Sequence, residues 1–118
     1  MTYNEAAAGF FYEGYNCAQA TALAFSDVPG IRKEELLRIT AGFGAGMGGL
    51  RQQCGAVSAM VCIAGIVKGG YPPNDNAAKK ELYDTVKAMN AAFIERFGTT
   101  ECRELLAQAS VRKDSRLL

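Results

Sequence analysis

The stretch from Gly42 to Val67 reads GFGAGMGGLRQQCGAVSAMVCIAGIV, and it decides the fold because a glycine-rich loop runs directly into an apolar helix. The repeated glycines let the backbone take positive φ angles and approach another group closely. From Gln52 to Val67 there is no charged side chain, and apolar residues cover every face, a pattern typical of a helix buried on all sides. The run is shorter than the roughly 20 apolar residues that cross a bilayer. We therefore expect a central core helix and no membrane insertion.

The sequence before the loop also predicts helices. Residues 3–25 are rich in alanine, and the favourable N-cap residue Asn16 predicts that this helix bends or restarts there. A restart at that point places Cys17 in the first turn of the second piece. A further short helix is expected from Lys33 to Ala41.

Three helices are expected from the loop onward. The central helix should run from about Arg51 to Lys68, where a glycine pair and a proline pair end it. The next helix should begin at Asp75 or Asn76 and end at Gly98. It carries an apolar stripe at helical spacing, made of Leu82, Val86, Met89, Phe93 and Phe97.

The last helix should follow Thr100, a suitable cap, with Cys102 in its first turn. Residues 110–118 are polar enough to fray, although Leu117 and Leu118 could pack on a partner chain, so a homo-oligomer stays open. We find no alternating strand pattern and no internal repeat. The sequence thus predicts an all-α fold, a single domain over residues 1–118 that forms a bundle of four to six helices around a buried central helix.

Composition excludes several classes of function. A net charge of +1, with the basic residues spread along the chain, gives no field that would hold nucleic acid. The N-terminus has no basic segment followed by an apolar run, so we expect neither a signal peptide nor a transit peptide, and a cytoplasmic location. The chain has no histidine, which excludes Ser-His and Cys-His couples and imidazole metal ligands.

Cysteine is then the leading candidate for chemistry. The four cysteines Cys17, Cys54, Cys62 and Cys102 form no CxxC pair and no zinc-knuckle pattern. Any shared site must therefore be assembled by the fold. In a reducing cytosol a structural disulfide is not expected, which leaves reactive thiols, metal ligands or plain core packing.

Three of these cysteines share one local setting. Cys17, Cys54 and Cys102 each fall at the expected start of a helix, where free amide groups and the helix dipole favour a thiolate and lower the pKa of a thiol. A thiolate is both a redox nucleophile and a soft metal ligand, so the setting suits disulfide exchange and iron–sulfur ligation. Cys62 lies within an apolar helix and is most simply a packing residue.

The loop glycines Gly44, Gly46 and Gly49 spell G-x-G-x-x-G, but the dinucleotide-binding motif needs a preceding strand, which this chain lacks. A weaker interpretation is that backbone amides of the loop hold a small anion or a cluster sulfide at the helix start.

Three segments together resemble the C_GCAxxG_C_C family: GYNCAQA at Gly14–Ala20, the glycine loop leading into Cys54-Gly55-Ala56, and GTTECREL at Gly98–Leu105. The resemblance implies a small helical protein that is inferred to be redox-active, with some members associated with haem or iron–sulfur domains. It matches the motif cysteines to Cys17, Cys54 and Cys102. The chain departs from the motif at Ala59, where the family has glycine. It also lacks a counterpart of the fourth motif cysteine and any haem attachment motif.

These observations leave three hypotheses. The first is a thiol-based redox or electron-transfer protein, with thiol–disulfide activity in which Cys54 is the most activated thiol and Cys17 or Cys102 is its disulfide partner. The second is an iron–sulfur or soft-metal binding module that uses the same three cysteines. The third is a non-catalytic helical assembly subunit whose cysteines only pack. The sequence names no substrate, cofactor or redox partner.

Overall fold

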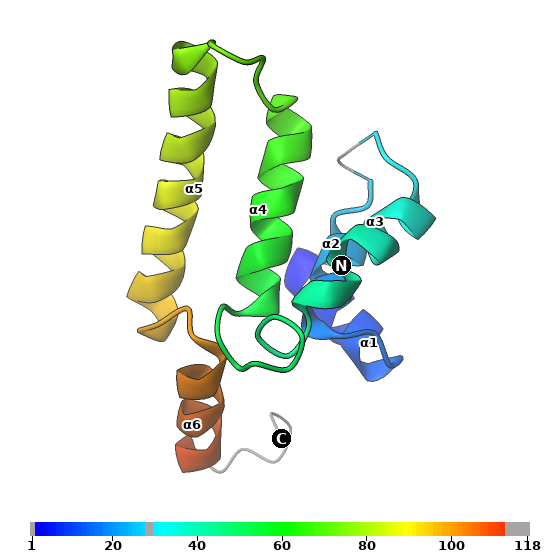
Figure 1. Ribbon diagram of the computed structural model, residues 1–118. Helices are drawn as coiled ribbons and strands as arrows, with labels where there is room; N and C mark the ends of the chain where they lie inside the picture. The colour runs from blue at the N-terminus through cyan, green and yellow to red at the C-terminus, as the bar shows by residue number, and fades with distance from the viewer. Residues whose placement is uncertain (1, 28–29, 113–118) are drawn as a thin grey trace.

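The computed structural model describes residues 2–27 and 30–112, and within them the chain forms helices joined by loops (Figure 1). This part of the chain contains no strand, so the predicted all-α class is confirmed. The elements in order are α1 (Tyr3–Tyr12), α2 (Cys17–Ala24), α3 (Lys33–Thr40), the 3-10 turn η1 (Ala41–Phe43), α4 (Gly55–Lys68), α5 (Asn76–Phe97) and α6 (Cys102–Arg112).

The break between α1 and α2 occurs where the sequence predicts it. Gly14 has a φ of 110°, which turns the chain, and Asn16 then caps α2. The Asn16 side-chain oxygen accepts a hydrogen bond from the Gln19 amide at 2.8 Å, and the Gln19 side chain accepts one from the Asn16 amide at 3.3 Å. This capping box makes Cys17 the first residue of α2.

The core is built from small residues on facing helices. Ala18 and Ala22 of α2 pack against Ala59 of α4, with Phe43 lying against this cluster. Side chains this small let the two helices approach closely. The largest fully buried apolar side chain is Leu36 of α3, which places α3 on the same core.

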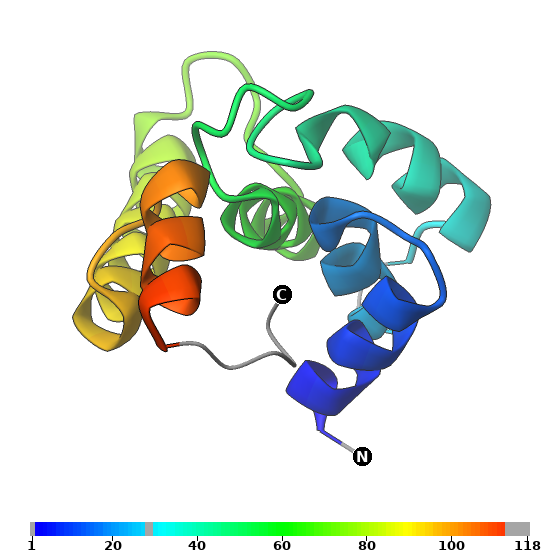
Figure 2. The same cartoon turned by 90° about the horizontal axis from the view of Figure 1, so that it is seen from below.

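Helix α4 is central, with α5 and α6 on one side and α1 to α3 on the other (Figure 2). Its burial is greatest in its first half and falls toward its C-terminal end, so it is less complete than its composition predicts. Val57, Ala59 and Ile63 are buried, whereas Val67 is 55 % exposed. The cause is the long partner α5, which runs beside α4 (Figure 1) but contributes no buried residue. The predicted stripe of α5 faces α4 in part, and Leu82, for example, is half-buried.

The ends of α4 and α5 follow the predicted signals. Helix α4 ends at Gly69 with a φ of 76°, and α5 ends at Gly98 with a φ of 84°. Both glycines take the left-handed conformation that ends helices. The Asp75 side chain accepts a hydrogen bond from the Ala78 amide at 3.0 Å and so caps the start of α5.

The start of α4 differs from the prediction, since the helix begins at Gly55 and not near Arg51. Residues 52–54 leave the glycine loop as a segment that meets the segment before α6. An isolated antiparallel bridge joins Gln53 to Glu101. Tertiary pairing therefore replaces the first helical turn that local propensity favours, and it ties the loop to the start of α6.

The last helix is longer than the sequence predicts. Helix α6 continues to Arg112, so residues 110–112 extend the helix where we expected the tail to begin. Residues 113–118, with the two terminal leucines, lie outside the described residues. No helix in the described part of the chain is both long and apolar enough to cross a bilayer.

Candidate functional site

Three cysteines from separate segments border one cavity of about 400 Å³. Cys17 comes from the start of α2, Cys54 from the residue before α4, and Cys102 from the start of α6. All four cysteines of the chain are free thiols, and these three are half-buried. The walls are largely apolar, and the remaining lining residues are Phe11, Asn16, Ala45, Arg51, Gly55, Leu105 and Leu106.

The sulfur of Cys17 lies directly against the backbone at the start of α4. A Cβ atom added at Gly55 would be 2.5 Å from the Cys17 Sγ and 2.9 Å from the carbonyl oxygen of Phe43. Real Cβ atoms do not approach other atoms so closely, so glycine is needed at this position. The glycine that follows Cys54 thus has a steric role, which is to let the sulfur of Cys17 lie beside the first turn of α4.

Backbone pairing brings Cys54 and Cys102 together. The Cys54 amide donates to the Thr100 carbonyl at 2.8 Å, and the Cys102 amide donates to the Gln52 carbonyl at 2.6 Å. In this antiparallel pattern both cysteines lie on the same face at diagonal positions, where Cα atoms are about 7 to 8 Å apart. Disulfides need Cα atoms within about 7 Å. A small shift of one segment would bring the pair within bonding range.

The electrostatics of Cys54 differ from the expectation. Burial raises the pKa of the Cys54 thiol, although the amide groups of Val57 and Ala56 oppose this effect. The nearby thiols of Cys17 and Cys102 raise it further, since like charges repel. The amide groups at the helix start therefore lower the pKa of Cys54 as predicted, but burial has the larger effect. Cys54 is the N-cap residue of α4 and is half-buried, and the direction of its pKa shift is opposite to the one expected from its place at a helix start.

Cys102 has a cationic partner. The Arg51 guanidinium Nη1 donates to the Cys102 Sγ at 3.6 Å. The backbone holds Arg51 in place, since its amide donates to the Ala45 carbonyl at 3.1 Å and its carbonyl accepts from the Arg103 amide at 3.1 Å. Arg51 has a φ of 59°, a left-handed conformation that is uncommon for a residue with a side chain. The glycine loop and the start of α6 together fix this residue.

The glycine loop folds mostly upon itself. The amides of Gly49 and Gln52 donate to the carbonyls of Gly44 and Gly46, at 3.2 Å and 2.9 Å. A Cβ atom at Gly44 would be 2.5 Å from the Asn16 side chain, so the loop's close neighbour is the capping residue of α2. Since these amides are already paired, they favour a structural role for the loop over the expected anion site.

Cys62 stands apart from the other three cysteines. It lies in the middle of α4, half-buried, and does not border the cavity that the others share. Burial alone raises the pKa of its thiol. This placement fits the packing role that the sequence indicates.

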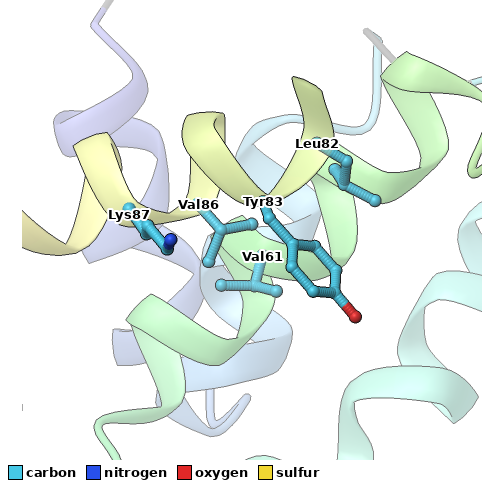
Figure 3. Close-up of a pocket in the computed structure, with 5 residues that line it drawn as sticks. All are labelled: Val61, Leu82, Tyr83, Val86 and Lys87. Carbon is cyan, nitrogen blue, oxygen red and sulfur yellow. The ribbon is translucent and has the colours of Figure 1, made fainter. Parts of the chain in front are cut away.

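A second cavity contains no thiol. This cavity of about 330 Å³ lies between α4 and α5, lined by Val61 from α4 and by residues of α5 (Figure 3). Its lining is apolar apart from the Tyr83 hydroxyl and the Lys87 amine at the ends of their side chains. The cavity at the three cysteines therefore differs from this one in that thiols border it.

The sequence prediction found the three cysteines but not their surroundings. Phe11 and Ala45 carry no local signal for a site, because only the folded chain brings α1 and the loop to the cysteines. The contact of Arg51 with Cys102 depends on the bridge between distant segments, so no local pattern indicates it. Among residues 2–27 and 30–112, no three Cys, Asp or Glu side chains are placed to hold a metal ion.

Comparison with known proteins gives one match. Residues 15–117 match the family model described as "Putative redox-active protein (C_GCAxxG_C_C)". The matched region contains all of the cysteines and every residue of the cavity except Phe11. No curated protein and no solved structure matches the chain.

Proposed function

This chain belongs to the C_GCAxxG_C_C family of putative redox-active proteins, and from that premise we propose that it is a thiol-based redox protein in which Cys54 forms a reversible disulfide with Cys102 or Cys17. The observation that carries the proposal is the shared cavity, which three cysteines distant in sequence border together. Free thiols persist in a reducing compartment, so we keep the cytoplasm as its expected location.

The chemistry is thiol–disulfide exchange with a disulfide substrate. Two protein thiols reduce one substrate disulfide, so that one disulfide forms in the protein and two substrate thiols leave with the two protons. The reverse reaction oxidises a dithiol substrate. The apolar walls of the cavity, which include Phe11 and Leu105, give an uncharged part of such a substrate a surface to bind.

Disulfide mapping tests this function. The native protein is treated with oxidised glutathione, its remaining thiols are blocked, and peptides are identified by mass spectrometry. We expect a disulfide that joins Cys54 to Cys102 or Cys17. Reduction with dithiothreitol should restore the free thiols without unfolding the protein.

Cys62 supplies the matched control, since it lies within α4, the helix that Cys54 caps, and outside the cavity. The Cys62→Ser variant should form the same disulfide as the unmodified protein, whereas Cys54→Ser should form none. A native protein whose four thiols all stay free under these conditions would contradict the proposal.

Iron–sulfur binding is the second candidate, because three cysteines border a single cavity. Clusters are held by four cysteine ligands, so a cluster here would need movement of the three thiols and a fourth ligand from another subunit. Anaerobic purification followed by a visible spectrum and iron analysis tests it. A colourless protein without iron under those conditions would count against this function.

A further inference from the structure

We propose that Cys102 is the thiol that attacks a disulfide substrate, that Cys54 is the thiol that resolves the mixed disulfide, and that Arg51 is the positioning residue that keeps the Cys102 sulfur ready. This inference rests on the proposed function and deepens it. The carrying observation is geometric, since Cys102 has the guanidinium contact of Arg51 and shares one face of the backbone bridge with Cys54.

Arg51 holds the attacking sulfur in place. Its Nη1 donates to the Cys102 Sγ at 3.6 Å, and a charge-assisted hydrogen bond of this kind restricts where the sulfur can lie. Both residues border the same cavity. Arg103 is adjacent in sequence and exposed, and its backbone, not its side chain, makes the contact with Arg51.

Cys54 has the properties of a resolving thiol. It is half-buried at the start of α4, and burial disfavours its thiolate, so it reacts slowly with a substrate from solvent. Its diagonal position beside Cys102 lets it reach a mixed disulfide formed there. Backbone hydrogen bonds hold the start of α6 beside Cys54, whereas α6 makes only sparse contacts with the other helices, so the small shift that bonding needs is a tilt of α6 about this point.

The exchange balances in two steps. The Cys102 thiolate attacks one sulfur of the substrate disulfide, the substrate S–S bond breaks, and the first substrate thiolate leaves and takes up a proton. Cys54 then loses its proton and attacks the Cys102 sulfur, which releases the second substrate thiol. The protein ends oxidised, with a Cys54–Cys102 disulfide, and the substrate ends as two thiols.

Trapping experiments assign the two roles. With 2,2′-dipyridyl disulfide as the probe, the unmodified protein should release two pyridinethione molecules and form the internal disulfide. Cys54→Ser should release one and keep a stable mixed disulfide on Cys102. Cys102→Ser should react slowly, and a Cys102→Ser variant that reacts as fast as the unmodified protein would overturn the assignment.

Substitutions of Arg51 test the positioning role. In the Cys54→Ser background, Arg51→Gln removes the charge but keeps a side chain of similar length. Like arginine, glutamine must take the left-handed backbone conformation at this position. The substitution should slow the reaction of Cys102 at neutral pH by up to about fivefold, as expected for one exposed charge contact. Arg51→Lys should restore much of the rate, and Arg103→Gln should leave it unchanged.

The outcomes separate this inference from the proposed function. If the internal disulfide forms but Arg51→Gln and Arg103→Gln react alike, the role of Arg51 is wrong and the redox function stands. If the unmodified protein forms no disulfide at all, the proposed function itself fails. Melting temperatures of the variants exclude misfolding as the cause of a lower rate.

Discussion

A single glycine, Gly55, controls how closely two sulfur-bearing segments approach. The space that a Cβ atom would need is occupied by the Cys17 Sγ and by the carbonyl of Phe43. The residue directly after Cys54 is glycine, and in this structure the reason is steric. The requirement comes from packing, because the position lies in an ordinary helical turn.

Gly55→Ala should therefore destabilise the protein. Overpacking of a tight site costs about 1 to 3 kcal/mol in the free energy of unfolding, and the displaced Cys17 should change its alkylation rate. Urea denaturation and thiol labelling measure the two effects. Gly65→Ala is the control on the same helix, since nothing lies within 4 Å of its added Cβ. It should be stabilising by roughly 0.5 to 1 kcal/mol, and equal effects of the two substitutions would contradict the steric argument.

Burial of Cys54 predicts a loss of stability at alkaline pH. The pKa of its thiol is raised in the folded protein, so the unfolded chain loses this proton at a lower pH than the folded chain does. The contribution of Cys54 is complete below the ordinary thiol pKa and disappears as pH rises through the higher folded value. The free energy of unfolding should thus fall less steeply with pH in Cys54→Ala than in the unmodified protein.

Urea denaturation between neutral and alkaline pH measures this difference. Cys62 also has a raised pKa through burial, so Cys62→Ala should remove a separate part of the slope. Tyrosine and lysine titrations are common to all three proteins and cancel in the comparison. Identical slopes would show that neither buried thiol contributes.

At the scale of the elements, a residue that caps a helix can also anchor a distant segment. Asn16 caps α2, and its side-chain Nδ2 also donates to the Ala41 carbonyl at 3.0 Å. Its contact with Gly44 places the glycine loop beside α2. One capping residue therefore links the helix that carries Cys17 to the loop that carries Arg51.

Asn16→Ala should cost more than the loss of a cap alone. A cap contributes typically about 1 kcal/mol, and the bond to the Ala41 carbonyl adds a further fraction to about 1.5 kcal/mol. Thr2→Ala is the matched control, because Thr2 caps α1 with the same capping box and makes no bond to a distant segment in the described structure. Thermal unfolding should show the larger loss for Asn16→Ala, and equal losses would contradict the anchoring role.

At the scale of the whole molecule, the two halves differ in how well they are packed. Six of the eight residues of α2 are buried, whereas α5 contains no buried residue over its 22 residues. Apolar side chains on the outer part of the molecule remain exposed, among them Ile94 at 40 % and Val67 at 55 %. The arm formed by α4 and α5 is therefore less stabilised by burial than α2 is.

Native-state hydrogen exchange should reflect this difference. We expect the amides of α2 to exchange slowest and those of α5 to exchange much faster, because local opening of α5 exposes little additional apolar surface. Strong protection of α5 that weakens on dilution would instead show that a second copy of the chain covers it, which is the homo-oligomer that the sequence leaves open. Strong protection at every concentration would contradict the prediction for the single chain.

The sequence alone determined the helices, their caps and the choice of cysteine, because those signals are local. Asn16, Asp75, Gly69 and Gly98 act within a turn of their own position, so their effects are readable without the fold. The absence of histidine likewise makes the cysteine thiols the leading candidates for chemistry, and the spacing of the cysteines shows that only the fold could bring them together. The predicted helices and the caps at Asn16, Asp75, Gly69 and Gly98 agree with the structure, apart from the start of α4.

Only the tertiary structure decided the state of each thiol. Cys54 lies at a helix start, as local propensity requires, but segments distant in sequence bury it and raise its pKa. The contact between Arg51 and Cys102 exists because residues 51–54 pair with the segment before α6 instead of joining α4. Desolvation and charge contacts depend on what the rest of the chain places nearby, and no pattern within one segment encodes that.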